Sequence, residues 1–135
     1  IEVHAHTNEN IDFIDRVDTS IGFLKIDKIQ FRQVIENIIS NAVKFTKGKK
    51  GIICVTGYKT DTSFIVKIED NGEGFEWIQI KELVDKYSKW NSNMMWLGMW
   101  LYLCKKIISM HHGTIEAGVS KEFGGAEFII EIPIT

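Results

Sequence analysis

The stretch DKIQFRQVIENIISNAVKFTKG, residues 27–48, decides the fold because it reads as one long amphipathic helix. Asp27, followed three residues later by Gln30, predicts a capping box at its start, and Gly48 predicts its end. An apolar stripe at helical spacing predicts a core-facing side that consists of Phe31, Val34, Ile35, Ile38, Ile39, Ala42 and Phe45. A polar stripe at the same spacing lies roughly a third of a turn away and is expected at the rim of the core. It consists of Gln33, Asn37, Asn41 and Lys44.

The segments around this helix predict strands and two further helices. Apolar and polar residues alternate, or β-favouring residues gather, in 1–6, 52–58, 64–69, 113–120 and 126–134. Residues 11–24 favour a hairpin or an irregular strand, and helical spacing recurs in 75–87 and 97–111. This order predicts an α/β (α+β) two-layer sandwich in which helices cover one face of a mixed sheet.

Length and composition predict a single domain spanning residues 1–135. Hydrophobic residues make up 44% of the chain, and the net charge of -2 gives no general attraction to nucleic acid or to anionic membranes. The sequence opens with no secretory signal, and its longest apolar run, residues 94–104, is too short to span a bilayer. We therefore expect a cytoplasmic domain without membrane contact. Cys54 and Cys104 lie in separate apolar runs, which favours two reduced, buried thiols over a metal site or a disulfide.

Three motifs follow one another along the chain. The first is the amide stripe of residues 27–48, the second is the turn Asp70-Asn71-Gly72-Glu73-Gly74 after a buried strand, and the third is Gly98, in a loop that opens a later helix. Each motif is weak alone, because an asparagine at a helix rim is usually solvated and Asp-Asn-Gly is a common turn. Their combination and order carry the functional interpretation.

Together these motifs resemble the ATP-binding domain of sensor histidine kinases, within the larger family that includes gyrase and the heat-shock 90 chaperones. ENIISNAVKFT, residues 36–46, looks like the asparagine box of that family, and EDNGEGF, residues 69–75, looks like its first glycine box. LYLCKKIISMHHGTI, residues 101–115, is similar to the helix and strand behind its second glycine box. The resemblance covers residues 26–134 and implies a Bergerat-type ATP-binding fold.

The resemblance also implies roles for individual residues. Asn41 would hold the Mg²⁺ that bridges the phosphates, Asn37 would support it, Lys44 would contact phosphate and Phe45 would border the nucleotide. An amide oxygen is a hard, neutral ligand suited to Mg²⁺, and a lysine one turn further on can neutralise a phosphate oxygen. The chemistry of these side chains therefore agrees with the implied roles.

The glycine-rich turns would shape the base and phosphate pockets. Asp70 would accept a hydrogen bond from the adenine amino group, although a turn-forming aspartate is the simpler alternative. Gly72 and Gly74 would let the backbone pass close to the base. Tyr87 stands where the family has an aromatic box, and a plain helix end explains it equally well. Gly98 would be the remaining glycine of the phosphate-binding turn.

The expected lid, about residues 88–100, departs from the family pattern. The family ends its lid in Gly-x-Gly-x-Gly, whereas this chain has Trp96-Leu97-Gly98-Met99-Trp100. Indoles at two glycine positions occupy space that the phosphates would use, and they are strained where the backbone must be left-handed. The sequence therefore predicts weakened nucleotide binding.

All four tryptophans and three of the four methionines of the chain fall near the expected rim of the nucleotide pocket. One face of a buried helix explains only some of them, and large aromatic and thioether side chains are typical of a binding surface. The predicted interface consists of Trp77, Trp90, Met94, Met95, Trp96, Met99 and Trp100. Its cover could be the lid folded into an empty pocket, a second copy of the chain, or another protein. One hypothesis is therefore a lid remodelled, naturally or by engineering, into a nucleotide-free interaction or homodimerising module.

The phosphoryl acceptor is expected outside this sequence. A histidine kinase transfers the ATP γ-phosphoryl group to a histidine on a separate dimerisation domain, and this sequence contains no such helical hairpin. We therefore assign no catalytic residue here and expect that domain as a partner. His111 and His112 end a helix, where a cation or a polar cap is the simple explanation. Hydrolysis would need a carboxylate near Asn37, and Glu36 points about 100° away on the helix.

Overall fold

The computed structural model describes residues 10–22, 24–46, 50–72 and 102–134 of the chain. In these ranges the sheet has five strands, and helical residues 102–110 precede its fourth strand. The labelled elements in chain order are β1 (Ile11–Val17), α1 (Lys28–Phe45), β2 (Gly51–Lys59), β3 (Ser63–Asp70), β4 (Thr114–Val119) and β5 (Ala126–Pro133).

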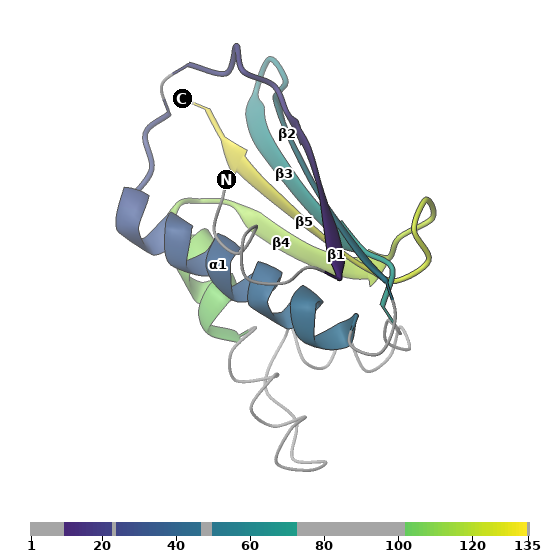
Figure 1. Cartoon of the computed structure of the whole chain (residues 1–135). Helices are drawn as coiled ribbons and strands as arrows, with labels where there is room; N and C mark the ends of the chain where they lie inside the picture. Colours follow the sequence, from purple (N-terminus) through teal and green to yellow (C-terminus); the bar gives the residue numbers. More distant parts are fainter. Residues whose placement is uncertain (1–9, 23, 47–49, 73–101, 135) are drawn as a thin grey trace.

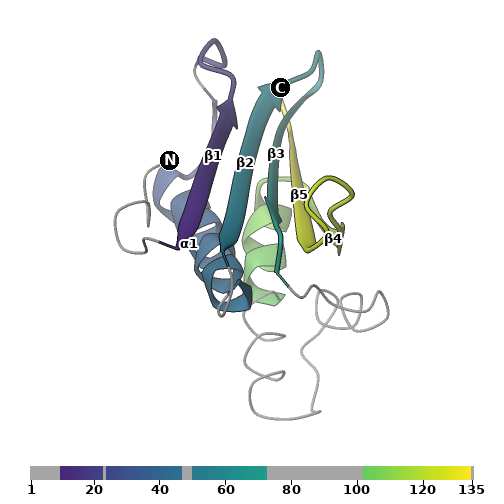
Figure 2. The same cartoon turned by 45° about the vertical axis from the view of Figure 1, so that its right-hand side comes forward.

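The five strands form one mixed sheet in the order β1-β2-β3-β5-β4. β1 runs parallel to β2, with Ile11 opposite Gly51, and all other neighbouring pairs are antiparallel. α1 and helical residues 102–110 lie side by side on one face of this sheet (Figures 1 and 2). The predicted two-layer sandwich with helices on one face is therefore confirmed.

The strand predictions hold for the segments that the structure describes. β2 to β5 match the predicted strands to within a residue or two at each end. In residues 11–24 the hairpin alternative is wrong, because β1 pairs with β2 and the chain after Val17 is irregular. The predicted strand 1–6 and the predicted helix 75–87 lie outside the described residues.

The core lies between α1, helical residues 102–110 and the covered face of the sheet. In the predicted apolar stripe of α1, Phe31 is half-buried and the side chain of Phe45 lies outside the described part of the structure. The other members, Val34, Ile35, Ile38, Ile39 and Ala42, are buried as expected. These side chains pack in one cluster with Ile53, Ile68 and Ile108. Each fully buried aliphatic side chain contributes roughly 1.5–3 kcal/mol of transfer free energy, so this layer holds the helices in place.

The start of α1 differs from the predicted capping box in one partner. Asp27 Oδ1 accepts hydrogen bonds from the backbone N–H groups of Ile29 at 3.1 Å and Gln30 at 3.0 Å, so the N-cap is confirmed. The backbone N–H of Asp27, however, donates to His111 Nε2 at 2.9 Å. A histidine from a distant segment thus makes the reciprocal bond, and the role predicted for Gln30 is wrong. The predicted end at Gly48 lies outside the described residues.

The cysteine prediction is confirmed, since Cys54 and Cys104 are both free and buried. No group of three or more metal-ligating side chains occurs within the ranges that the structure describes. The same ranges contain no helix with the length and apolar character needed to cross a membrane.

Candidate functional site

Two buried polar residues lie at one end of the sandwich, where α1 and β3 both end (Figure 1). Asn41, near the end of α1, and Asp70, the last residue of β3, are each only 2% exposed. Burying a polar group costs free energy unless it is hydrogen-bonded, so the partners of each side chain indicate its role.

Backbone groups from two segments hold Asp70 in place. Its Oδ1 accepts hydrogen bonds from the N–H of Gly72 at 2.8 Å and from the N–H of Ala126 at 3.1 Å. Its carbonyl oxygen accepts a third, from the N–H of Gly125 at 3.0 Å. The carboxylate orientation is therefore fixed by the turn after β3 and by the start of β5. Asp70 does act as a turn residue, but a deeply buried one.

Gly125 is a site-building residue that sequence reasoning missed. A Cβ placed on it would collide with the carboxylate and the carbonyl oxygen of Asp70, and would lie 2.6 Å from the amide nitrogen of Gly72. Only glycine fits this close approach. The Gly124-Gly125 pair before an alternating strand is the signal that could have found it, since such glycines often mark close backbone contacts.

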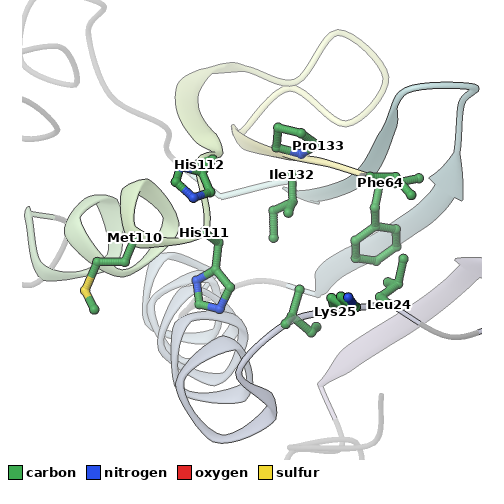
Figure 3. A pocket seen from close by; sticks show the side chains of 10 residues that line it. Leu24, Lys25, Phe64, Met110, His111, His112, Ile132 and Pro133 are labelled. Carbon is green, nitrogen blue, oxygen red and sulfur yellow. The ribbon is translucent and has the colours of Figure 1, made fainter.

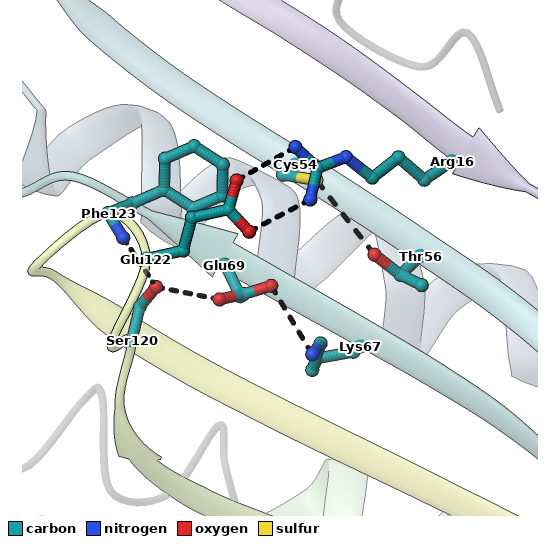
Figure 4. A network of polar contacts seen from close by, with 8 residues as sticks. All are labelled: Arg16, Cys54, Thr56, Lys67, Glu69, Ser120, Glu122 and Phe123. Atoms are coloured by element: carbon teal, nitrogen blue, oxygen red, sulfur yellow. Dashed lines mark hydrogen bonds and ion pairs between the residues drawn. The ribbon is translucent and has the colours of Figure 1, made fainter.

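A polar network on the uncovered face of the sheet fixes the turn that carries Gly125 (Figure 4). Ser120 Oγ donates to Glu69 Oε2 at 2.7 Å and accepts from the N–H of Phe123 at 3.0 Å. Glu69 and Ser120 are 3% and 1% exposed, so this anchor is buried. Lys67 Nζ lies 3.7 Å from the other oxygen of Glu69. The turn at 120–125 is thus tied to the residue that precedes Asp70.

An exposed ion pair extends this network to β1. The guanidinium of Arg16 donates two hydrogen bonds to the carboxylate of Glu122, at 2.8 and 2.9 Å, and lies 5.7 Å from the ring centre of Phe123. The hydrogen bonds from Arg16 lower the pKa of Glu122. Exposed pairs of this kind contribute little to stability, so we treat the pair as an orienting contact for the turn.

Asn71 and Gly51 connect the turn after β3 to the end of α1. Asn71 Oδ1 accepts from the N–H of Ile52 at 2.8 Å, and its Nδ2 donates to the carbonyl of Lys50 at 3.1 Å. A Cβ on Gly51 would lie 2.8 Å from Oγ1 of Thr46, the residue that follows α1. The two parts of the candidate site are therefore held together by the start of β2.

The two asparagines of α1 differ in their surroundings. Asn41 Nδ2 is buried and has no hydrogen-bond partner within the described part of the chain. Asn37, one turn earlier, is half-buried and hydrogen-bonds with the thiol of Cys104 from helical residues 102–110. Burial raises the pKa of Cys104 to about 12, so this thiol is neutral at pH 7. Sequence reasoning assigned Cys104 to the core and did not connect it with Asn37.

Other predicted site residues are only partly described or not described. Lys44 and Phe45 belong to α1, but their side chains lie outside the described part of the structure. Gly72 is buried beside Asp70. The remaining predicted nucleotide and interface residues fall in 73–101, outside the described ranges: Gly74, Tyr87, Gly98, Trp77, Trp90, Met94, Met95, Trp96, Met99 and Trp100.

Comparison with known proteins identifies the family. The profile described as "Histidine kinase-, DNA gyrase B-, and HSP90-like ATPase" matches residues 26–135. The chain is 30% identical over 111 residues to the alginate biosynthesis sensor protein KinB of Pseudomonas aeruginosa, covering 82% of this chain and 18% of that protein. It is 31% identical over 114 residues to the sensor histidine kinase YclK of Bacillus subtilis (strain 168), covering 81% and 24%. The chain thus spans about a fifth of the length of these relatives.

Solved structures agree with this result. The nucleotide-free catalytic domain of histidine kinase ThkA superposes with a TM-score of 0.82 and 28% identity, covering 99% of this chain and 89% of that one. ThkA in complex with the response regulator protein TrrA gives a TM-score of 0.77 and 26% identity, covering 99% and 39%. The chain therefore belongs to the histidine kinase-, DNA gyrase B- and HSP90-like ATPase family, as a catalytic domain of the sensor histidine kinase type.

Proposed function

We propose that this chain binds ATP together with Mg²⁺ at the end of the sandwich that contains Asn41 and Asp70. We further propose that it donates the γ-phosphoryl group to a histidine on a separate dimerisation domain. The observation that carries the proposal is the buried amide of Asn41, whose Nδ2 has no partner among the described residues.

An unpartnered amide in this position suits a ligand site. Leaving a buried polar group without a hydrogen bond costs about 1–3 kcal/mol, which a ligand would recover. The amide oxygen of Asn41 is the kind of hard donor that Mg²⁺ accepts, and its NH₂ group can donate to a phosphate oxygen. Bound at Asn41, Mg²⁺ would neutralise phosphate charge as the γ-phosphoryl group leaves. In this proposal Asn37 supports Asn41, and Lys44 contacts a phosphate.

The base would lie beside the turn after β3. A carboxylate has about four acceptor positions, so Asp70 can accept from an adenine amino group in addition to its two backbone donors. Gly72 and Gly74 would let the chain pass close to the ring, and Phe45 and Tyr87 would border it. Gly98 would contribute its N–H to the phosphates.

The residues of α1 favour phosphoryl donation over hydrolysis. An amide cannot act as a base, and Asn37 stands where a hydrolytic enzyme would need a carboxylate. Glu36 does not replace it, because its Oε1 lies 3.4 Å from Nε of Arg32 on the exposed side of the helix. The likeness to ThkA, solved with the response regulator TrrA, supports a role in which a regulator receives the phosphoryl group downstream.

Two tryptophans of the lid are expected to lower the affinity for nucleotide. Trp96 and Trp100 take the places of two glycines in the resemblance, and we propose that their bulk lowers the affinity for nucleotide. Changing both to glycine removes that bulk. We expect the variant W96G/W100G to bind Mg²⁺–ADP at least about tenfold more tightly, which corresponds to about 1.4 kcal/mol.

Isothermal titration with Mg²⁺–ATP and Mg²⁺–ADP tests the proposal. Asn41→Leu should abolish binding at millimolar nucleotide, whereas Gln33→Leu, an exposed amide two turns earlier on α1, should bind like the unmodified chain. No nucleotide binding by either the unmodified chain or W96G/W100G would overturn the proposal.

The alternative is a nucleotide-free module that associates through the lid. It rests on the concentration of tryptophan and methionine in 77–100, as counted in the sequence. Analytical ultracentrifugation separates the two functions. A dimeric mass that W96G/W100G converts to a monomer, together with no nucleotide binding, would decide for the interaction module.

A further inference from the structure

The imidazole of His111 joins the two helical segments at the end of the sandwich opposite Asp70. Its Nδ1 lies 2.9 Å from the carbonyl oxygen of Ile107, in the last turn of helical residues 102–110. Its Nε2 lies 2.9 Å from the backbone nitrogen of Asp27, the N-cap residue of α1. Figure 3 shows the ring of His111 directed toward the start of α1.

Only one form of the ring makes both contacts. The backbone N–H of Asp27 can only donate, so Nε2 must be an unprotonated acceptor. The carbonyl of Ile107 can only accept, so Nδ1 must carry the hydrogen. The contacts therefore require the neutral Nδ1–H tautomer. An imidazolium carries hydrogen on both nitrogens and loses the bond to Asp27.

The helices that His111 joins are those that carry the candidate nucleotide site. α1 presents Asn37 and Asn41, and helical residues 102–110 present Cys104, whose thiol hydrogen-bonds with Asn37. His111 and Cys104 are thus two ties between the same pair of helices, one at the start of α1 and one near its middle. A tie at the start of α1 limits how far the helix can slide or turn.

We infer that neutral His111 is a positioning residue, which holds α1 against helical residues 102–110 so that Asn37 and Asn41 keep their places for nucleotide. The inference rests on the proposed function. Protonation of the ring breaks the tie, so nucleotide affinity should fall when the ring becomes an imidazolium.

The charged residues on the segments next to the ring are Asp27, the N-cap of α1, and Lys25, which lines the same cavity as His111. His112 shares a cavity of about 380 Å³ with His111 and Lys25. The strand residues that line this cavity, from β3 and β5, are apolar. The bond to Asp27 is present while the ring is neutral and is lost when the ring is protonated.

The test combines pH-dependent titration with matched variants. His111→Ala removes the tie, and His111→Gln offers an acceptor that does not titrate. His112→Asn is the control, because it removes the adjacent imidazole while asparagine tolerates the backbone φ of 62° at this position. The Mg²⁺–ADP affinity is measured from pH 5.5 to 8, and the wild-type affinity is divided by that of each variant at the same pH. This ratio cancels the titration of the nucleotide phosphates.

The expected result is a wild-type to His111→Ala affinity ratio that is several-fold at pH 8 and falls toward one as the ring is protonated at lower pH. His111→Gln should fall between the two at pH 8, and His112→Asn should follow the wild type throughout. A ratio of one at every pH would overturn the inference.

A second measurement does not depend on nucleotide. Two-bond ¹⁵N–¹H spectra of the imidazole should show the Nδ1–H tautomer of His111 at pH 8, and a ring protonated at Nε2 would overturn the inference even if nucleotide binds. Failure of both the wild type and W96G/W100G to bind nucleotide at pH 8, with the ring in the Nδ1–H form, would instead overturn the proposed function.

Discussion

Asn41 and Asp70 are buried to the same degree at the same end of the sandwich, yet their hydrogen bonding is opposite. The carboxylate of Asp70 is held by backbone N–H groups of Gly72 and Ala126, so this side of the site is completed by the chain itself. The amide nitrogen of Asn41 has no partner in the described residues. The difference teaches that one half of the candidate site is built by the scaffold, whereas the other half keeps a buried donor without a partner among the described residues, as the proposed ligand site requires.

The largest effect is expected from Gly125→Ala, which disturbs the backbone that holds the carboxylate of Asp70. The added Cβ meets the carboxylate and the backbone of Asp70, and neither can move without losing the bonds that fix the turn. We expect the free energy of unfolding to fall by about 3 kcal/mol in urea denaturation, at the upper end of overpacking effects.

A neighbouring glycine provides the control. Gly124 has no atom within 4 Å of a built Cβ, although its φ is +86°. Gly124→Asn should therefore cost less than about 1 kcal/mol, because asparagine tolerates a left-handed backbone. Equal losses for the two variants would mean that the close approach to Asp70 is unimportant.

The turn that carries Gly125 can also be loosened from the other face of the sheet. Ser120→Ala removes the hydroxyl that donates to Glu69 and accepts from Phe123. It leaves the buried carboxylate of Glu69 and the part-buried N–H of Phe123 without that partner. We expect a loss of roughly 1–2 kcal/mol in the free energy of unfolding. Ser109→Ala, at an exposed position of helical residues 102–110, should change stability by less than about 0.5 kcal/mol. A Ser120→Ala variant as stable as Ser109→Ala would contradict the anchoring role.

The local patterns of the sequence predicted the layers of this fold well. α1 and strands β2 to β5 follow from period and turn chemistry, which are set by neighbouring residues. β1 was harder, because its parallel partner β2 lies beyond α1 and no local signal specifies such pairing. The cap from His111 to Asp27 spans 84 residues and was missed for the same reason, because the sequence offered a cation or a polar cap for His111 only at the end of its own helix.

The candidate site was predictable in its residue types but not in its supports. Asn41 and Asp70 stand out because their motifs are local. The sequence predicted Asn41 at the rim of the core, whereas the structure buries both side chains at one end of the sandwich. Their assigned roles toward nucleotide stay predictions. Gly125 and Ser120 act on Asp70 only through the pairing of β3 with β5, and Cys104 reaches Asn37 only through helix packing. Contacts of this kind depend on tertiary geometry, which a single sequence does not display.

Replacing Asn41 by leucine tests the other half of the candidate site. If the amide is held without a partner for the sake of a ligand, then Asn41→Leu should stabilise the nucleotide-free chain, by about 1 kcal/mol, because a buried polar group is removed. Urea denaturation without nucleotide measures this gain. Asp70→Leu should instead destabilise the chain, because two backbone N–H groups lose their acceptor. Destabilisation by Asn41→Leu as large as that by Asp70→Leu would show that both halves of the site are structural.

The carboxyl group of Glu127 gives the test with the smallest expected effect on stability. Glu127 faces Glu69 across β3 and β5, on the side of the sheet away from α1. Burial raises the pKa of Glu127, and the charge of Glu69 adds to the shift. The carboxylate form of this side chain is thus disfavoured in the folded protein.

The sign of the pH dependence follows from that shift. A carboxyl whose pKa is higher in the folded than in the unfolded state costs nothing at low pH and destabilises the fold as the pH rises through the raised pKa. Glu127→Gln is neutral at every pH and should therefore be more stable than the unmodified chain at pH 7, by a few tenths of a kcal/mol after allowance for solvent screening. At pH 4 the advantage should vanish, because Glu127 is then protonated. Thermal unfolding at the two pH values measures the difference, with the exposed Glu116→Gln of β4 as a control that should change little at either pH. An advantage for Glu127→Gln that persists unchanged at pH 4 would mean that packing, and not the charge of this carboxyl, sets its cost.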